Sequence, residues 1–184
     1  KKQNRPTLCI TNNPKSPLAA TSDFVITLHA GSEKAVAATK TYTSSLISIA
    51  LFSTALAKDN NRLNEISQLP EILNQVIQES LEVIVSAERY RYIDSCVVIG
   101  RGFNYCTAYE IALKVKELSR VVTVPYSSAD FKHGPIAIVK PGIPIIVISH
   151  SGPMGEHIDQ FSSHLLELGA EIIAITDQPP LLKK

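Results

Sequence analysis

The fold is decided by the stretch Cys96-Val97-Val98-Ile99-Gly100-Arg101-Gly102. Four apolar residues in a row are typical of a strand buried on both faces, because a half-exposed strand alternates apolar and polar residues. The two glycines that follow favour a tight turn, and a helical pattern then runs to about Ser119. A buried strand joined by a turn to a helix is the repeating unit of an α/β protein with a parallel sheet.

The same alternation of strands and helices extends in both directions along the chain. Further strands are predicted over Thr7–Thr11, Phe24–Leu28, Val121–Val124, Pro144–Ser149 and Glu171–Thr176. Further helices are predicted over Glu33–Ala57 and over Gly155–Leu168. Between them, a turn at Lys58–Asn61 is followed by a helical region to about Arg91, in which Pro70 starts a new helix. The first of these helices is rich in small and apolar residues, so we expect it to be buried on several sides. The fold class is therefore α/β, with doubly wound parallel sheets flanked by helices.

A weak internal repeat bears on the domain organisation. Leu8–Pro14 resembles Ile173–Pro179 at an offset of 165 residues, which is about the size of one α/β domain. Chance likeness between two strand ends is the alternative. If the repeat is real, residues 1–60 are the C-terminal part of one domain copy and residues 93–184 are most of a second copy. Residues 61–92 then form a helical connection.

Composition excludes several classes of protein. Of the 184 residues, 45% are hydrophobic and 19% are charged, with a net charge of +1, which excludes a disordered chain and argues against a nucleic-acid partner. No apolar run reaches the roughly 18 residues of a membrane span, and the N-terminus lacks a signal-peptide pattern. Three cysteines with no C-x-x-C spacing favour neither zinc nor a disulfide framework. We expect a cytoplasmic protein without a metal.

Two groups of residues could carry acid–base chemistry. Glu110, Lys114 and Glu117 share one helix face, because their spacing is i, i+4, i+7. A carboxylate held beside a lysine can move a proton on carbon, although a solvated salt-bridged face has the same spacing. His133 lies in Lys132-His133-Gly134-Pro135, where Gly-Pro fixes a turn, and it is either an acid–base residue or a structural one.

Two turns are candidate anion sites. Gly100, Arg101 and Gly102 link a strand to a helix, so backbone N–H groups there could approach a phosphate. The third glycine of a dinucleotide fingerprint is missing, and an ordinary tight turn is the alternative. Ser149 and Ser151, in Ser149-His150-Ser151-Gly152, also stand between a strand and a helix. They would suit either a phosphate or a helix cap.

Four stretches closely resemble the sugar isomerase (SIS) domain family. They are Ala30–Thr43, Gly100–Gly102, Ala112–Ser119 and Phe131–Pro135, and the likeness extends over nearly the whole chain. The family includes phosphosugar isomerases, glucosamine-6-phosphate deaminases and the isomerase half of glutamine–fructose-6-phosphate aminotransferase. The resemblance implies two flavodoxin-like SIS domains, each a parallel sheet flanked by helices.

The resemblance also assigns roles to residues. It implies that Glu117 moves a proton between C1 and C2 of the open-chain sugar and that Lys114 lies in the same site. It implies that His133 assists ring opening in the active site of a neighbouring subunit, and hence a homodimer. The stretch Val36-Ala37-Ala38-Thr39 resembles the segment whose backbone contacts the sugar, so Val36, Ala38 and Thr39 are candidate substrate-binding residues.

The implied function is a phosphosugar isomerase, or an amino-sugar phosphate aminotransferase or deaminase, acting on fructose 6-phosphate or glucosamine 6-phosphate. Moving one proton through an enediol needs neither a metal nor a redox cofactor, so we expect no cofactor. In the family, the sugar phosphate is held by first-domain loops, and a C-terminal tail supplies a further lysine. We expect both to fall outside these 184 residues, as does the glutamine-hydrolysing domain. A non-catalytic phosphosugar-binding or regulatory protein and an inactive folded remnant are the alternatives.

Overall fold

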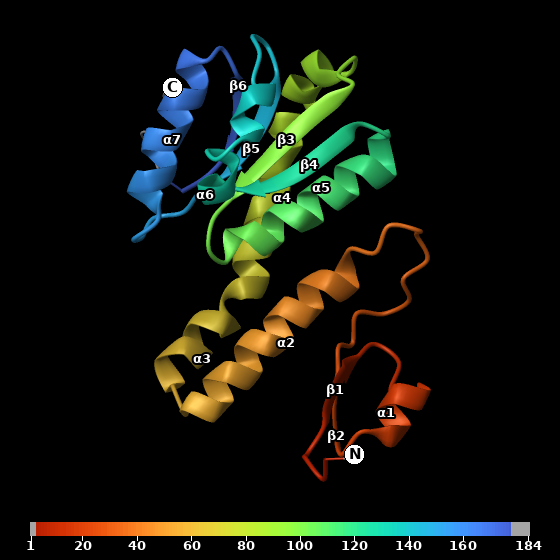
Figure 1. Cartoon of the computed structure of the whole chain (residues 1–184). Coiled ribbons are helices and arrows are strands. Elements are labelled where there is room, and N and C mark those ends of the chain that lie inside the picture. Colours follow the sequence, from red (N-terminus) through yellow and green to blue (C-terminus); the bar gives the residue numbers. More distant parts are fainter. Residues whose placement is uncertain (1–2, 178–184) are drawn as a thin grey trace. The chain divides into compact units, whose positions relative to one another are not determined.

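The computed structural model describes residues 3–177, and the chain consists of two compact units (Figure 1). The boundary along the chain falls between Glu88 and Arg89. The first unit contains β1 (Leu8–Thr11), α1 (Pro17–Thr21), β2 (Phe24–Thr27), α2 (Lys40–Ala57), α3 (Asn60–Ser67) and α4 (Leu69–Ala87). The short helix η1 (Glu88–Tyr90) spans the division. The second unit contains β3 (Ser95–Gly100), α5 (Asn104–Ser119), β4 (Val122–Ser127), α6 (Ser128–Phe131), η2 (Pro135–Ile138), β5 (Pro144–Ile148), α7 (Gly155–Glu167) and β6 (Glu171–Ile175). Gln178 and Pro179 of the internal repeat, and the end of the predicted second copy, lie outside the described residues.

The second unit has one sheet of parallel strands in the order β4-β3-β5-β6. Successive residues of β3 point to opposite faces, as the pleat of a strand requires. Val97 and Ile99 pack in a cluster that includes Phe161 of α7, whereas Val98 packs with Ala108 and Ala112 of α5. Helices therefore cover both faces, and the predicted doubly wound α/β fold is confirmed.

Aromatic packing anchors the segment that precedes His133. Phe131, the last residue of α6, is fully buried. Its ring meets those of Tyr126 and Phe161 edge to face, with centroid distances of 5.1 and 6.1 Å. Burying a Phe side chain contributes about 1.5–3 kcal/mol, so this contact holds the end of α6 against the sheet. The turn that carries His133 begins directly after it.

Strand β4 runs beyond the predicted Val121–Val124, through Pro125 to Ser127. A proline has no N–H to donate to a neighbouring strand, and the predicted strand ended directly before it. β4 is an edge strand of the sheet, and Pro125 pairs in register with Val98 on one side only. An edge position tolerates the missing donor, so the strand continues.

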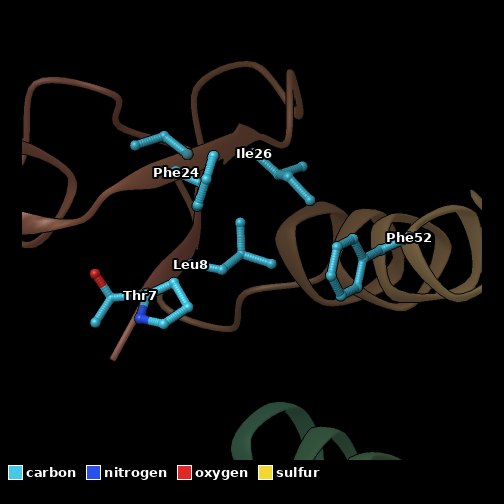
Figure 2. A pocket seen from close by; sticks show the side chains of 7 residues that line it. Thr7, Leu8, Phe24, Ile26 and Phe52 are labelled. Atoms are coloured by element: carbon cyan, nitrogen blue, oxygen red, sulfur yellow. The ribbon is translucent and has the colours of Figure 1, made fainter. Parts of the chain in front are cut away.

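The first unit has a two-stranded parallel sheet, with Leu8 in register with Phe24 and Thr11 with Thr27. The short helix α1, which the sequence pattern missed, connects the strands. Phe24 and Val25 are 62% and 41% exposed, so the expected burial on both faces is wrong for this sheet. With Leu8, Ile26 and Phe52 of α2 they line an apolar groove of about 560 Å³ (Figure 2).

Helix α2 differs from its prediction in two ways. It begins at Lys40 rather than at Glu33, and residues 33–39 form an irregular loop. The expected burial on several sides is also wrong: Thr54 is buried, but Ile49 and Leu56 are 53% and 70% exposed. The sequence pattern showed which residues are apolar but not what covers them.

The helical connection after α2 is built from local signals. Lys58 adopts a left-handed conformation (φ 53°) and ends α2, and the Asp59 carboxylate then caps α3 by accepting from the Arg62 N–H at 3.1 Å. Pro70 stands in the first turn of α4, as predicted. Among residues 3–177, no helix is both long and apolar enough to cross a membrane.

Candidate active site

Helix α5 carries three of the candidate residues. Gly100, at the end of β3, allows the first turn of this helix to lie close to the sheet. A side-chain carbon on Gly100 would lie 2.1 Å from the carbonyl oxygen of Asn104, so only glycine allows this approach. Ala108 and Ala112 are buried between α5 and the sheet. The small residues on that face bring the helix near the strands. Glu110, Lys114 and Glu117 remain partly accessible on its other sides.

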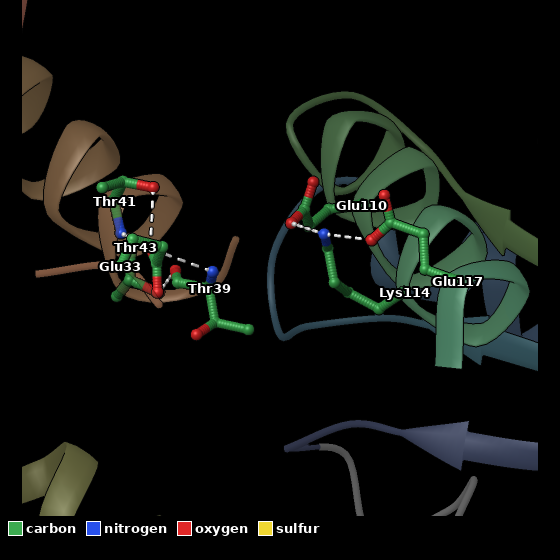
Figure 3. Close-up of polar contacts among 7 residues, drawn as sticks. All are labelled: Glu33, Thr39, Thr41, Thr43, Glu110, Lys114 and Glu117. Atoms are coloured by element: carbon green, nitrogen blue, oxygen red, sulfur yellow. Dashed lines mark hydrogen bonds and ion pairs between the residues drawn. The ribbon is translucent and has the colours of Figure 1, made fainter. Parts of the chain in front are cut away.

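Lys114 joins the two glutamates of this helix into one polar cluster (Figure 3). Its ammonium nitrogen lies 2.7 Å from Oε2 of Glu117 and 3.6 Å from Oε1 of Glu110. The side chains of Lys114, Glu110 and Glu117 are 18%, 20% and 31% exposed. The hydrogen bond to Glu117 is the main cause that raises the pKa of Lys114 above its ordinary value. The lysine therefore stays charged at neutral pH and orients the Glu117 carboxylate.

His133 is exposed in the turn between α6 and η2. Its backbone N–H donates to the carbonyl of Asp130 at 3.0 Å, and the following Gly134 has a φ of 141° that favours glycine. The sequence thus builds a defined turn from which the imidazole extends. Within residues 3–177, no hydrogen bond or ion pair joins His133 to Lys114 or Glu117.

The predicted sugar-contacting stretch lies in the loop before α2. Val36 is fully exposed and Thr39 is exposed, whereas Ala37 is buried at 6% and Ala38 is half-buried. This loop belongs to the first unit, whereas Lys114, Glu117 and His133 belong to the second. The candidate residues therefore belong to both units.

The first candidate anion turn is closed by its own backbone. Gly102 has a φ of 59°. The N–H groups of Asn104 and Tyr105 donate to the carbonyls of Arg101 and Gly102 at 3.2 and 3.1 Å. The N–H groups of Asn104 and Tyr105 are thus used within the turn, and the anion site at Gly100–Gly102 stays a prediction.

At the second candidate anion turn, a carboxylate takes the donors. The N–H and hydroxyl of Ser151 both donate to Asp177, at 2.6 Å each, and these bonds lower the pKa of Asp177. Ser149 is buried and its N–H donates to the Ile175 carbonyl. Sequence reasoning missed Asp177, since it follows β6 and meets Ser151 only because β5 and β6 are neighbours.

Sequence reasoning also missed Glu33, which it placed inside a helix. The Glu33 carboxylate instead accepts hydrogen bonds from Thr39 and Thr41 at the start of α2. The signal that could have located this start is Thr39 itself, because threonine before an apolar helical pattern favours an N-cap position. Within the described residues, no three His, Cys, Asp or Glu side chains gather as a metal site would require.

The family model for the SIS domain matches residues 1–55 and 90–180, which together make up most of the chain. The chain belongs to the SIS domain family. The match includes every candidate residue of the polar cluster on α5, the His133 turn and the loop before α2.

Relatives with known names support this membership. The chain is 31% identical over 187 residues to a glutamine–fructose-6-phosphate aminotransferase from Thermus thermophilus, an alignment that covers 97% of this chain and 31% of that protein. Among solved structures, it resembles the C-terminal domain of glucosamine-fructose-6-phosphate aminotransferase from Francisella tularensis (TM-score 0.82, 28% identity, 96% of this chain and 52% of that one). It also resembles a glucosamine-6-phosphate deaminase from Thermotoga maritima (TM-score 0.77, 27% identity, 96% and 54%).

The chain thus spans about a third of the length of the curated relatives it matches and about half of the matched solved chains. Its relatives are enzymes whose names refer to phosphosugars and amino-sugar phosphates.

Proposed function

We propose that this SIS-family chain supplies the proton-transfer centre of an enzyme acting on a sugar phosphate of the fructose 6-phosphate or glucosamine 6-phosphate type. The observation that carries the proposal is the 2.7 Å contact between Lys114 and Glu117. This contact holds the Glu117 carboxylate in one orientation. The helix that carries it packs close to the sheet, which the absence of a side chain at Gly100 allows. The names of the relatives supply the substrate class.

In this proposal, the Glu117 carboxylate removes a proton from C1 of the open-chain ketose. The C1–H electron pair becomes the C1=C2 double bond, and the C2 carbonyl oxygen takes up a proton, which gives an enediol. Glu117 then returns its proton to C2 while the C1 hydroxyl loses one, which leaves an aldehyde. A positioned acid–base residue contributes about 10²–10⁴-fold to such a step. In deamination of an amino-sugar phosphate, the same proton shift is followed by loss of ammonia.

Lys114 positions the carboxylate and keeps a positive charge beside the enediol as it forms. Val36, Ala38 and Thr39 are the proposed sugar contacts, and the exposure of Val36 is compatible with that role. His133 is proposed to act on the ring in the site of a second copy, within a homodimer. The exposed position of its turn supports this assignment.

Solvent exchange tests the proposal directly. The intact protein is incubated with fructose 6-phosphate in deuterated water, and deuterium at C1 is followed by NMR. We expect exchange with the wild type and a loss of about 10²–10⁴-fold with Glu117→Gln. The matched control is Glu167→Gln, which removes a 77% exposed carboxylate on α7 and should leave the rate unchanged.

Two results would contradict the enzyme. If the wild type gives no exchange but binds the sugar phosphate in calorimetry, the protein is the alternative, a phosphosugar-binding or regulatory SIS protein. Equal exchange by the wild type and Glu117→Gln would remove Glu117 from the reaction.

The domain division is part of the same proposal. We infer that residues 1–60 correspond to the C-terminal part of one SIS domain, and residues 93–184 to most of a second, joined by the helical connection at 61–92. The separate matches at 1–55 and 90–180 support this division. The two-stranded sheet of the first unit, with its open apolar groove, is compatible with a partial copy.

A further inference from the structure

A single carboxylate oxygen organises the loop that precedes α2 (Figure 3). Oε2 of Glu33 accepts from the N–H of Thr39 at 3.3 Å, from the N–H of Thr41 at 3.1 Å and from the Thr41 hydroxyl at 3.0 Å. Glu33 is therefore bonded to residues six and eight positions further along the chain. The intervening segment must fold back on itself for these contacts to form.

Glu33 replaces the usual cap of α2. Thr39 occupies the N-cap position, but its side chain makes no capping hydrogen bond. A helix begins with N–H groups that lack partners within the helix, and a negative charge at this end also interacts favourably with the helix dipole. The bonds from Thr41 and Thr39 lower the pKa of Glu33, with the backbone bond from Thr41 as the largest cause. The carboxylate thus remains ionised and bonded at neutral pH.

The other end of the loop is held independently. The Asn12 amide donates to the Gly31 carbonyl at 2.7 Å and accepts from the Ala30 N–H at 3.0 Å. The ammonium of Lys40 donates to the Ser32 carbonyl at 2.9 Å. These bonds fix the chain up to Ser32 against β1 and the start of α2. The conformation of residues 34–38 then depends on the second anchor, which is Glu33.

We infer that Glu33 is the positioning residue of the sugar-contacting segment Val36–Thr39. This inference rests on the proposed function, in which the segment touches the sugar phosphate. Glu33 itself needs no contact with the sugar. It holds Thr39 while Ala37 stays buried, and so directs the exposed Val36 and the backbone beside it to one fixed position. Without the carboxylate, the segment has several conformations, and binding must select one of them.

Amide hydrogen exchange tests the positioning step without any sugar. In Glu33→Ala, amides of residues 33–41 should exchange roughly 5- to 30-fold faster, as expected for loss of a helix cap. Glu33→Gln keeps an acceptor oxygen and should recover part of the protection. Glu65→Ala removes an exposed glutamate from α3 and serves as the matched control, with no change expected in this loop. Unchanged exchange in Glu33→Ala would overturn the inference.

The link to substrate is tested in the intact protein with fructose 6-phosphate. We expect the Kd from calorimetry and the KM for C1 exchange to rise roughly 5- to 30-fold in Glu33→Ala, with kcat within about twofold of the wild type, because the loss is one of binding. Partial rescue by Glu33→Gln is expected. A faster-exchanging loop with unchanged Kd and KM would overturn the inference but not the proposed function. A wild type that binds no sugar phosphate would overturn both.

Discussion

Replacing Gly100 by alanine probes the junction on which the candidate site depends. The added carbon would lie 2.1 Å from the Asn104 carbonyl oxygen, 2.6 Å from its carbon and 3.0 Å from the Tyr105 nitrogen. All three atoms belong to the backbone at the start of α5, so no side chain can turn aside to make room. The start of α5 must move by about 1 Å to restore ordinary contact distances.

The expected cost follows from this obstacle. Extra atoms in a packed core typically cost about 1–3 kcal/mol, and a backbone obstacle belongs at the upper end of that range. We therefore expect Gly100→Ala to lower the free energy of unfolding of the second unit by about 3 kcal/mol. With a urea dependence of about 1–3 kcal/mol per molar, the unfolding midpoint should fall by about 1–3 M.

Gly102→Ala is the matched control. Gly100 is needed because a side chain would clash, whereas Gly102 is needed for its backbone conformation. An alanine at Gly102 meets nothing within 4 Å, but it must adopt a φ of 59°. That conformation costs roughly 1–2 kcal/mol, so Gly102→Ala should be the milder change.

Urea unfolding followed by tyrosine fluorescence is a suitable assay, since every tyrosine except Tyr42 lies in the second unit. A loss of stability in Gly100→Ala no greater than that in Gly102→Ala would refute the reasoning. It would mean that α5 is not held against β3 at this point.

Three further predictions concern exposed and buried side chains. If His133 acts in the site of a second copy, mixing Glu117→Gln with His133→Ala should restore up to about a quarter of the wild-type C1 exchange, because each mixed dimer contains one intact site; no recovery after subunit exchange would contradict the shared site. Of the cysteines, Cys106 is exposed and Cys9 and Cys96 are buried, so a thiol reagent such as Ellman's should modify Cys106 rapidly and the other two only on unfolding. Burial raises the pKa of Cys96 from 9.0 to about 11, so the unfolded chain releases this proton at a lower pH than the folded chain does. The associated stability is complete below about pH 9 and is lost as the pH rises through about 11, by up to roughly 3 kcal/mol. This loss is measured by comparing the urea unfolding midpoints of the wild type and Cys96→Ala between pH 9 and 11. If both midpoints depend on pH in the same way, the loss of stability does not come from Cys96.

Local patterns were sufficient for most of the fold. Runs such as Cys96–Ile99 predicted buried parallel strands, because a strand covered on both faces has apolar residues at every position. Gly100 marked the turn between a strand and a helix, and Pro70 marked the first turn of a helix, through backbone properties that do not depend on distant contacts. The pairing of Lys114 with Glu117 was likewise predictable, since residues three or four apart meet on one helix face.

The structure corrected the predictions made from the sequence where they depended on contacts with distant parts of the chain. Pro125 continues β4 because that strand is at the edge of its sheet, and sheet order is not a local property. Several apolar side chains of α2 and β2 are exposed. An apolar sequence pattern therefore does not reveal whether the rest of the same chain covers those side chains.

The sequence by itself therefore determined the α/β class, the position of nearly every strand, and the spacing that brings Glu117 to Lys114. Tertiary structure alone decided the hydrogen-bond partners of Glu33 and of Ser151. Both depend on a carboxylate reaching backbone or side-chain donors across a fold of the chain. The apolar periodicity of a helix or strand reflects which of its faces is exposed to solvent. The hydrogen-bond partner of a polar group depends instead on which other segments of the chain lie beside it.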